Sequence, residues 1–344
     1  MWHRDILKAP TIKFARFRYR MSAHRTLQTM ALLPHHFDEK VTLAIIGGTG
    51  LYDLPNLKPV ARLTVLTPWG FPSAPITIAR TDLGFPVAFL ARHGQHHDLL
   101  PSDVPLRANI AALKLLGVKA IVAFLAVGSL QQEIKPRDFV LPSQVIDRTK
   151  GIRPSTFFEK GFVAHAMFGE PFDLHLRLVI ENAVQPGFLQ GFDGGAAPTF
   201  HTKAVSTDDL TVVCMEGPAF LTRAELKLYR TWGGSVINML VLPEAKLARE
   251  AEIAYQMICM LTDYDSWNEL EEPVTVETVV LNLKANSANA CKLAAHLIDV
   301  LAETQGLGDS LAGLMKFAIS TLPHGVKKEL LEKMHFLHPG YWQV

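Results

Sequence analysis

The sequence predicts an α/β protein with a mostly parallel or mixed sheet. Short apolar, β-branched runs recur along the chain, most of them end in a glycine-rich or polar turn, and helical patterns lie between them. The chain has 344 residues, of which 49% are hydrophobic and 19% are charged, which is enough for a large core. From residue 38 to residue 344 no stretch rich in proline, glycine or serine divides the chain, so we expect one domain there.

The expected elements alternate along the chain. Strands are expected at five apolar runs, residues 41–46, 87–91, 120–124, 211–214 and 236–238. Helical spacing is found at residues 109–116, where Gly117 follows as a C-cap, and again at 243–260 and 284–305. The helix over 243–260 places Glu244, Lys246, Arg249 and Glu250 on its polar positions. Residues 257–262 also fit a strand that would enter the sheet.

Residues 1–37 differ from the rest, because they hold seven arginines and lysines against a single acid, Asp5. We interpret this segment as a basic extension that is disordered or loosely docked, with an organelle transit peptide as the alternative. We expect residues 38–344 to form the domain, with a C-terminal tail that is helical in patches. The expected location is cytoplasmic, and mitochondrial targeting by residues 1–37 is the alternative.

Charge and cysteine content exclude several classes of protein. The formal net charge is +1, so no strong field attracts nucleic acid or an anionic membrane. No apolar run approaches the roughly 20 residues of a membrane-spanning helix. Cys214, Cys259 and Cys291 lie in apolar contexts without metal-ligand spacing, so we expect buried free thiols and no metal site. The expected partner is a small-molecule substrate.

The turns that follow the apolar runs predict where a ligand binds. In open α/β sheets ligands bind outside the carboxyl ends of the strands. The candidate site therefore combines residues 47–50, 92–97, 125–129, 216–223, 238–240 and 262–265.

Two of these turns are suited to an anion. In Gly47-Gly48-Thr49-Gly50 the glycines let backbone N–H groups approach an anion, and Thr49 adds a hydroxyl donor. A tight exit from a strand explains the same glycines equally well. Arg92 offers a planar fork of donors that matches phosphate or carboxylate. His93 follows it, but no carboxylate set at ligand spacing accompanies the nearby histidines, which argues against a metal.

A third turn carries two carboxylates. Asp263 and Asp265 follow the apolar run of residues 258–261. Such a pair can accept a hydrogen bond from the exocyclic amine of adenine, and one acid can protonate N7 of a departing purine. An N-capping turn is the alternative interpretation.

Together these blocks resemble the 5′-methylthioadenosine phosphorylases, the trimeric branch of the purine nucleoside phosphorylases. The resemblance covers about residues 41–305, and the closing Pro339-Gly340-Tyr341-Trp342 is similar to fungal members. The motifs that carry it include Gly47-Gly48-Thr49-Gly50, Arg92-His93-Gly94, Gly128-Ser129, Met215-Glu216-Gly217-Pro218, Asn238-Met239, Pro243-Glu244 and Thr262-Asp263-Tyr264-Asp265.

The resemblance implies a single α/β domain around a mixed, distorted, barrel-like sheet flanked by helices, assembled as a homotrimer. The implied reaction is attack of phosphate on C1′ of methylthioadenosine, with phosphate as co-substrate and no cofactor. The resemblance assigns phosphate to Thr49, Arg92 and His93, and adenine to Asp263 and Asp265. It also places Met239 at the ribose, Phe220 on the base and His165 near the 5′ end of the substrate.

Three leucines depart from this pattern. Leu125, before Ala126, and Leu221 and Leu240 stand where the family usually has serine or threonine on the phosphate side. A leucine cannot donate a hydrogen bond to an anion. A hydrogen bond to a charged group contributes roughly 1.5–3 kcal/mol, so three losses would remove on the order of 5 kcal/mol of phosphate binding.

The leucines lead to one hypothesis and two alternatives. The hypothesis is a repurposed family member whose apolar cavity, lined by Leu125, Ala126, Leu221 and Leu240, takes a terpenoid or polyketide through a cyclisation or cycloaddition. Arg92, His93, Asp263 and Asp265 would then orient or activate that substrate. The first alternative is a working methylthioadenosine phosphorylase with shifted register or compensating backbone donors. The second is a non-catalytic nucleoside-binding protein.

Overall fold

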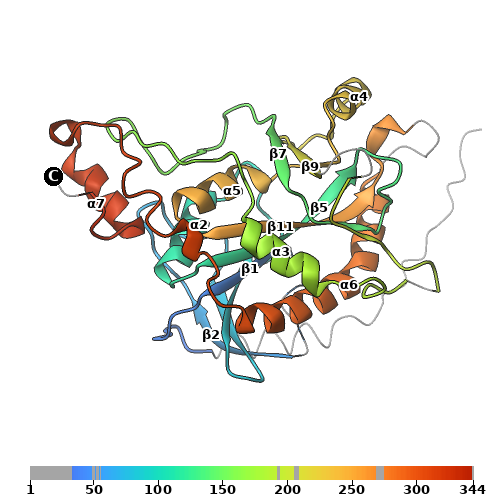
Figure 1. The fold of residues 1–344 in the computed structure, drawn as a ribbon, viewed down its shortest axis with the longest axis horizontal. Helices are drawn as coiled ribbons and strands as arrows, with labels where there is room; N and C mark the ends of the chain where they lie inside the picture. Colours follow the sequence, from blue (N-terminus) through green and yellow to red (C-terminus); the bar gives the residue numbers. More distant parts are fainter. Residues whose placement is uncertain are drawn as a thin grey trace, which may run out of the picture. The chain divides into compact units, whose positions relative to one another are not determined.

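A mixed sheet of 11 strands forms the centre of the chain in the computed structural model (Figure 1). The structure describes residues 33–48, 51, 54, 56–191, 194–204, 209–268 and 275–342. The chain divides into two units, Met1–Leu33 and Pro34–Val344, and the whole sheet belongs to the second. The strands are β1 Leu43–Gly47, β2 Leu57–Leu63, β3 Ile76–Thr81, β4 Pro86–Ala91, β5 Ala120–Ser129, β6 Phe139–Val140, β7 Gln144–Asp147, β8 Phe200–His201, β9 Thr211–Cys214, β10 Val236–Asn238 and β11 Ala254–Asp263. The α-helices are α2 Leu106–Leu115, α3 Leu174–Ala183, α4 Arg223–Thr231, α5 Val241–Glu250, α6 Val276–Glu303 and α7 Lys328–Leu337.

The sheet branches at β5, which has three neighbouring strands. Strands β4, β1 and β5 run parallel, and β11 pairs parallel with the other edge of β5. The start of β5 pairs with β1, while its last residues, Gly128 and Ser129, pair antiparallel with β10. The order along the main path is β2-β3-β4-β1-β5-β10-β9-β7. The sequence-based expectation of a single α/β domain with a mixed sheet flanked by helices is confirmed.

Two cores cover the two faces of the sheet. Because side chains alternate along a strand, Val122 and Phe124 of β5 face one core, which α3 and α6 also line. Ala123 and Leu125 face the other core, which includes residues of α2, α5 and α7. Figure 1 shows the long helix α6 running along one side of β1 and β11. The strand ends between these layers are thereby held on both faces.

One expected helix is two elements. Helix α5 ends at Glu250, Glu252 has a positive φ of 53°, and strand β11 begins at Ala254. All ten residues of β11 are buried. A strand buried on both faces has a continuous apolar run, which periodicity cannot separate from a buried helix. The prediction of one helix over 243–260 was therefore wrong after residue 250.

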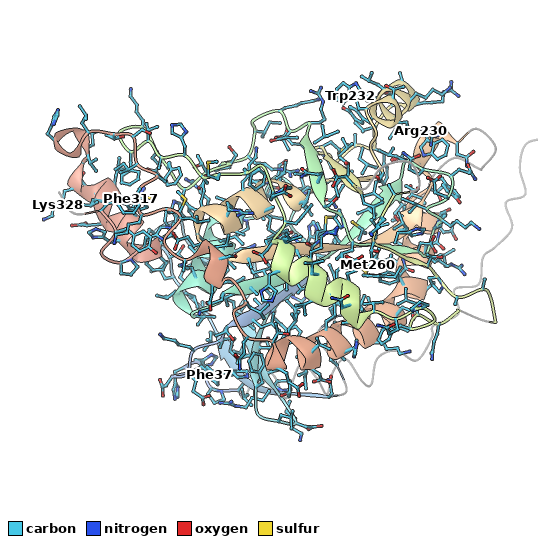
Figure 2. All side chains as sticks on the ribbon, viewed as in Figure 1. Phe37, Arg230, Trp232, Met260, Phe317 and Lys328 are labelled. Atoms are coloured by element: carbon cyan, nitrogen blue, oxygen red, sulfur yellow. The ribbon has the colours of Figure 1, made fainter. Side chains whose placement is uncertain are left out.

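Residues 34–37, at the end of the predicted N-terminal extension, lie along the sheet edge. The carbonyl of Pro34 accepts from the backbone N–H of Arg62 in β2 at 2.8 Å, and Arg80 of β3 lies 5.2 Å from the ring of Phe37 (Figure 2). Residues 1–32 lie outside the described residues. No helix in the described ranges is both long and apolar enough to cross a membrane.

Helix α7 and the residues after it hold the C-terminal end of α5. The buried His338 lies with Nε2 2.7 Å from the carbonyl of Glu250. The hydroxyl of Tyr341 donates to Glu252 at 2.8 Å, and the other carboxylate oxygen of Glu252 accepts from the N–H of Met315. The C-terminal segment thus closes the turn between α5 and β11.

This arrangement predicts an acid-sensitive contribution to stability. Burial lowers the pKa of His338 to about 4. A histidine in the unfolded chain has a pKa near 6.5, so as pH falls from 6.5 to 4 the unfolded state binds a proton that the folded state does not. The stability that the buried neutral ring contributes is therefore complete above pH 6.5 and is lost over this range. We expect the free energy of unfolding of wild type, relative to His338→Gln, to fall by on the order of 2 kcal/mol between pH 7.5 and 4.5. Urea unfolding of both proteins measures this, and a difference that is constant with pH would contradict it.

Candidate functional site

Parallel pairing brings several predicted site segments to one edge of the sheet. Strands β1, β4, β5 and β11 run in the same direction, so their carboxyl ends meet there. Arg92 follows β4, Asp263 ends β11, and Gly128 of β5 pairs with Asp263. Thr49, predicted to hold phosphate, lies outside the described residues. The edge therefore brings together residues that the sequence assigned to phosphate and residues that it assigned to adenine.

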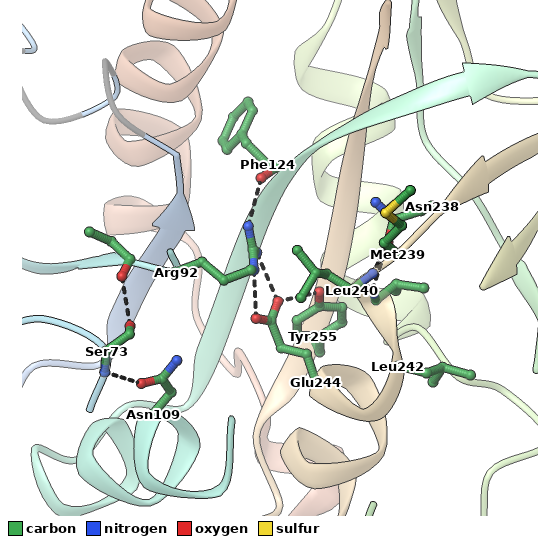
Figure 3. A network of polar contacts seen from close by, with 12 residues as sticks. Ser73, Arg92, Asn109, Phe124, Asn238, Met239, Leu240, Leu242, Glu244 and Tyr255 are labelled. Carbon is green, nitrogen blue, oxygen red and sulfur yellow. Dashed lines mark hydrogen bonds and ion pairs between the residues drawn. The ribbon is translucent and has the colours of Figure 1, made fainter. Parts of the chain in front are cut away.

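Arg92 is buried and bound to a carboxylate that the sequence-based site did not include (Figure 3). Its Nε and Nη2 donate to the two oxygens of Glu244 at 2.8 and 2.9 Å. Its Nη1 donates to the carbonyl of Phe124 at 3.1 Å, and the hydroxyl of Tyr255 donates to Glu244 at 2.7 Å. One guanidinium thereby joins the end of β4 to β5 and α5.

The position of Glu244 corrects the expectation that it lies on the polar face of its helix. It is 0% exposed, and Arg92 is 2% exposed. A buried carboxylate needs a partner, and the fork of Arg92 supplies a bidentate one. Because most of the charge of Arg92 is neutralised in this way, Arg92 fixes the geometry of this edge of the sheet more than it adds positive potential there.

His93 is held in one tautomer. Its Nδ1 lies 2.9 Å from the carbonyl of Leu99, which can only accept, so Nδ1 carries the hydrogen and Nε2 is an acceptor. Burial, and then the positive charge of Arg92, lower its pKa and favour the neutral ring. The ring stacks on that of His97 at 4.3 Å. A neutral Nε2 is suited to accept from the P–OH group of hydrogen phosphate.

The two predicted carboxylates lie together at the end of β11. Asp263 accepts from the N–H of Asp265 at 2.8 Å and from the hydroxyl of Thr262 at 2.7 Å. Asp265 accepts from the N–H of Ser266 at 2.8 Å through Oδ1, and within the described part of the chain its Oδ2 has no hydrogen bond. One carboxylate is thus fully engaged locally, and the other keeps an oxygen for a ligand.

The surroundings of Asp265 shift its pKa towards neutral. Burial, with a smaller effect of the neighbouring Asp263, raises the pKa of Asp265 to about 6. A Cβ on Gly128 would lie 3.3 Å from a carboxylate oxygen of each aspartate, which explains the glycine in β5. The short helix Asp265–Trp267 is fixed by the indole N–H of Trp267, which donates to the carbonyl of Ser129 at 2.6 Å.

Met239 and the turn before Phe220 pack against each other. A Cβ on Gly217 would lie 2.4 Å from the sulfur of Met239, and Gly217 has a φ of +67°, so only glycine fits there. Asn238 orients the next segment, because its Oδ1 accepts from the N–H groups of Leu240 and Val241 at 2.6 and 2.7 Å. Phe220 is 50% exposed and thus available to a ligand.

The three leucines do not form one exposed apolar lining. Leu125 and Leu240 are 3% and 6% exposed and belong to the core shared with α2, α5 and α7. Leu221 is half-buried against a separate small core beside α4. Ala126 is exposed, on the opposite face of β5 from Leu125. Two of the leucines are therefore core residues of this chain.

His165 lies apart from these residues. It is exposed and lines a cavity of about 540 Å³ together with Phe158, Phe162, Lys246 and Glu250. None of the other predicted site residues lines this cavity. Its assignment to the 5′ end of the substrate stays a prediction.

Two residues near the site were missed from the sequence, Arg153 and Glu244, and the role of Asn238 was not recognised. Glu244 had a signal, since Arg92 directly follows an apolar run predicted to be a strand, and a buried arginine requires a partner for its charge. Asn238 was included in a turn without a role, and Arg153 had no signal in its local pattern. Across the described ranges no group of three or more histidine, cysteine or acidic side chains is arranged to hold a metal ion.

Comparison with known proteins relates the whole arrangement to one family. Residues 42–299 match the family model described as "Phosphorylase superfamily". The chain is 76% identical over 329 residues to the S-methyl-5′-thioadenosine phosphorylase of Candida albicans strain SC5314, covering 94% of this chain and 96% of that protein. The same enzyme of Yarrowia lipolytica is 61% identical over 90% of this chain and 96% of its own length.

A solved structure agrees with this relation. The methylthioadenosine phosphorylase from an Antarctic soil metagenomic library is 38% identical and superposes with a TM-score of 0.76, covering 88% of this chain and all of that one. These likenesses contradict the hypothesis of a repurposed cyclase acting on a terpenoid or polyketide. The physical error was to treat Leu125 and Leu240 as the lining of a new cavity, although their side chains complete the core. The chain belongs to the phosphorylase superfamily.

Proposed function

We propose that the chain is an S-methyl-5′-thioadenosine phosphorylase, in which phosphate attacks C1′ of the nucleoside and adenine leaves. The observation that carries this is the carboxylate pair Asp263 and Asp265, with one oxygen left for a ligand and a pKa of about 6 on Asp265. The names of relatives that are 76% and 61% identical support it.

In the proposed reaction the adenine leaves as its bond to C1′ breaks and positive charge develops on the ribose. Asp265 donates a proton to N7, which stabilises the departing base, and Asp263 holds the backbone N–H of Asp265 in place. Met239 and Phe220 lie beside the ribose and the base. The enzyme then needs to place phosphate on the opposite side of C1′ rather than to form a covalent bond itself.

On the phosphate side the proposal relies on His93 and on backbone N–H groups at the strand ends. His93 accepts from the P–OH group through Nε2, while Arg92 and Glu244 keep the ends of β4, β5 and α5 in register. A hydrogen bond to a charged group contributes roughly 1.5–3 kcal/mol, and each donor that remains around the phosphate makes such a bond. The missing hydroxyls at Leu125, Leu221 and Leu240 therefore weaken phosphate binding without excluding it.

We also propose that the chain assembles as a homotrimer, as the family resemblance implies. Two loops lie side by side, because the carbonyl of Val163 accepts from the backbone N–H of Ser320 at 2.8 Å and the backbone N–H of His165 donates to the carbonyl of Ala318. Both loops expose apolar side chains. Figure 2 labels one of them, Phe317, which is 86% exposed. Such a cluster is what a subunit contact would cover. Its exposed apolar members are Val163, Met167, Leu314, Phe317 and Leu322.

The first prediction tests the reaction. Purified protein should release adenine from methylthioadenosine only when phosphate is present. Asp265→Asn should lower kcat/KM by about 10²–10⁴ because the proton donor is lost. Asp82→Asn, at an exposed ion pair with Lys58, is the matched control and should leave the rate unchanged. Adenine binding without turnover would favour the alternative of a non-catalytic nucleoside-binding protein.

The second prediction concerns pH. A raised carboxyl pKa means that the folded state holds the proton more tightly than the unfolded state. The ionisation of Asp265 therefore lowers the free energy of unfolding as pH rises from 3.8 to about 6. Asparagine tolerates the φ of 56° at this position. We therefore expect inactive Asp265→Asn to be more stable than wild type by on the order of 2 kcal/mol at pH 7.5, and by little at pH 4. Urea unfolding at both pH values decides, and a gain that is equal at both would refute the assignment.

The third prediction tests the assembly. Light scattering of the eluted protein should give the mass of three chains. Phe317→Asp should shift that mass towards one chain, because a buried carboxylate without a partner opposes association. Leu83→Asp is the matched control, since Leu83 is 83% exposed in the turn between β3 and β4, outside the proposed contact. A trimer that survives Phe317→Asp would place the contact elsewhere.

A further inference from the structure

A second buried arginine, Arg153, ties together segments that lie far apart in the sequence. It is 5% exposed and lies in the loop after β7. Its Nη1 donates to the carbonyls of Met239 and Leu242, the latter at 3.0 Å. Its Nη2 donates to the carbonyl of Glu216 at 2.5 Å, and its Nε to the hydroxyl of Ser102 at 3.3 Å. Three of the four acceptors lie in loops, and Leu242 lies in the first turn of α5.

The segments that Arg153 joins carry the nucleoside side of the site. Met239 is the residue proposed for the ribose. Glu216 begins the turn that continues through Gly217 to Phe220, the residue proposed for the base. The two segments already touch, since Met239 leaves no room for a Cβ at Gly217. Arg153 bonds to both backbones and so fixes the distance between the ribose and base positions.

The peptide group between Met239 and Leu240 is held at both ends. Its carbonyl accepts from Arg153, and its N–H donates to Oδ1 of Asn238 at 2.6 Å. Because a trans peptide is planar, with C=O and N–H pointing in opposite directions, these two bonds prevent the unit from turning. The side chain of Met239 then leaves the backbone in one direction only.

The partners of Arg153 differ from those of Arg92. Arg92 forms a bidentate ion pair with Glu244, whereas Arg153 donates to three carbonyls and a hydroxyl and forms no ion pair with a described residue. Burial lowers the pKa of Arg153, but an arginine stays protonated in proteins. A charged donor bonded only to neutral acceptors makes bonds stronger than neutral ones, which suits it to hold backbone in place.

We propose that Arg153 is a positioning residue for the nucleoside half of the site, while the Arg92–Glu244 pair independently holds the phosphate half. The inference rests on the proposed function, because it assigns the two halves to nucleoside and phosphate. Loss of Arg153 frees three carbonyls and lets the Glu216 and Met239 segments move relative to each other. Binding of the nucleoside should suffer, while binding of phosphate should change little.

The test compares Arg153→Ala and Arg153→Lys with Arg249→Ala. Arg249, in the last turn of α5, is a matched control, since its guanidinium also donates to a backbone carbonyl, that of Glu170. We expect Arg153→Ala to raise KM for methylthioadenosine at least tenfold and KM for phosphate less than threefold. Lysine should restore part of the loss, because one ammonium can reach the carbonyls of Met239 and Leu242 but not that of Glu216. Arg249→Ala should leave both KM values unchanged.

A chemical rescue separates positioning from loss of stability. Guanidinium at low millimolar concentration, far below denaturing levels, should restore kcat/KM of Arg153→Ala by refilling the vacated place, with no effect on wild type or Arg249→Ala. Equal increases in both KM values, or a loss that guanidinium does not reverse in a folded variant, would overturn the proposal. If Arg153→Ala does not fold, Arg153→Lys provides the test, because its KM for methylthioadenosine should rise more than its KM for phosphate.

A binding measurement distinguishes failure of this inference from failure of the proposed function. If wild type releases no adenine from methylthioadenosine in the presence of phosphate, the proposed phosphorylase activity is refuted, but the proposed role of Arg153 is not. Calorimetric titration of methylthioadenosine into wild type and Arg153→Lys would then measure the nucleoside site directly. Because lysine restores part of the contacts, a Kd for Arg153→Lys at least threefold weaker than that of wild type would uphold the role of Arg153, and an unchanged Kd would reject it.

Discussion

The buried ion pair between Arg92 and Glu244 is the interaction on which the site depends. It connects the end of β4 with α5, while Nη1 of Arg92 and the hydroxyl of Tyr255 extend it to β5 and β11. Removing one partner of such a pair costs about 3–5 kcal/mol, yet replacing both by apolar groups is often neutral. What the pair contributes is therefore geometry, because only a bidentate fork fixes the angle as well as the distance between two elements.

Arg153 uses a different acceptor chemistry for a related purpose. Strand ends and loops leave carbonyls without partners in the sheet, and buried carbonyls need donors. One guanidinium with five N–H groups can satisfy several of them at once, more than any other side chain. Among the described residues two arginines are buried, Arg92 after β4 and Arg153 in the loop after β7, the first neutralised by a carboxylate and the second by peptide dipoles. Each holds backbone that a loop alone would leave free to move.

Most of the fold was predictable, and the reasons for the misses are physical. The five predicted strands and the helix within residues 284–305 are present because their apolar runs were bounded by clear turns. The boundary between α5 and β11 was missed, since a strand buried on both faces has no alternation to read. At the site, Asp263 and Asp265 were found because they lie two positions apart in one turn. Arg153 and Glu244 were missed because the acceptors of Arg153 lie 51 to 89 positions away and the arginine partner of Glu244 lies 152 positions away.

The leucines show why a local motif is a poor measure of a whole site. Each substitution was judged as a lost donor, as if the anion had no other partner and the side chain no other contact. In the fold, Leu125 shares a core with Leu240, and burying a leucine contributes roughly 1.5–3 kcal/mol to folding. That gain is comparable to the hydrogen bond that a hydroxyl would have made to phosphate. A chain can therefore exchange hydroxyls for packing at the edge of an anion site and keep its reaction, provided that the cations and backbone N–H groups around the anion stay in place.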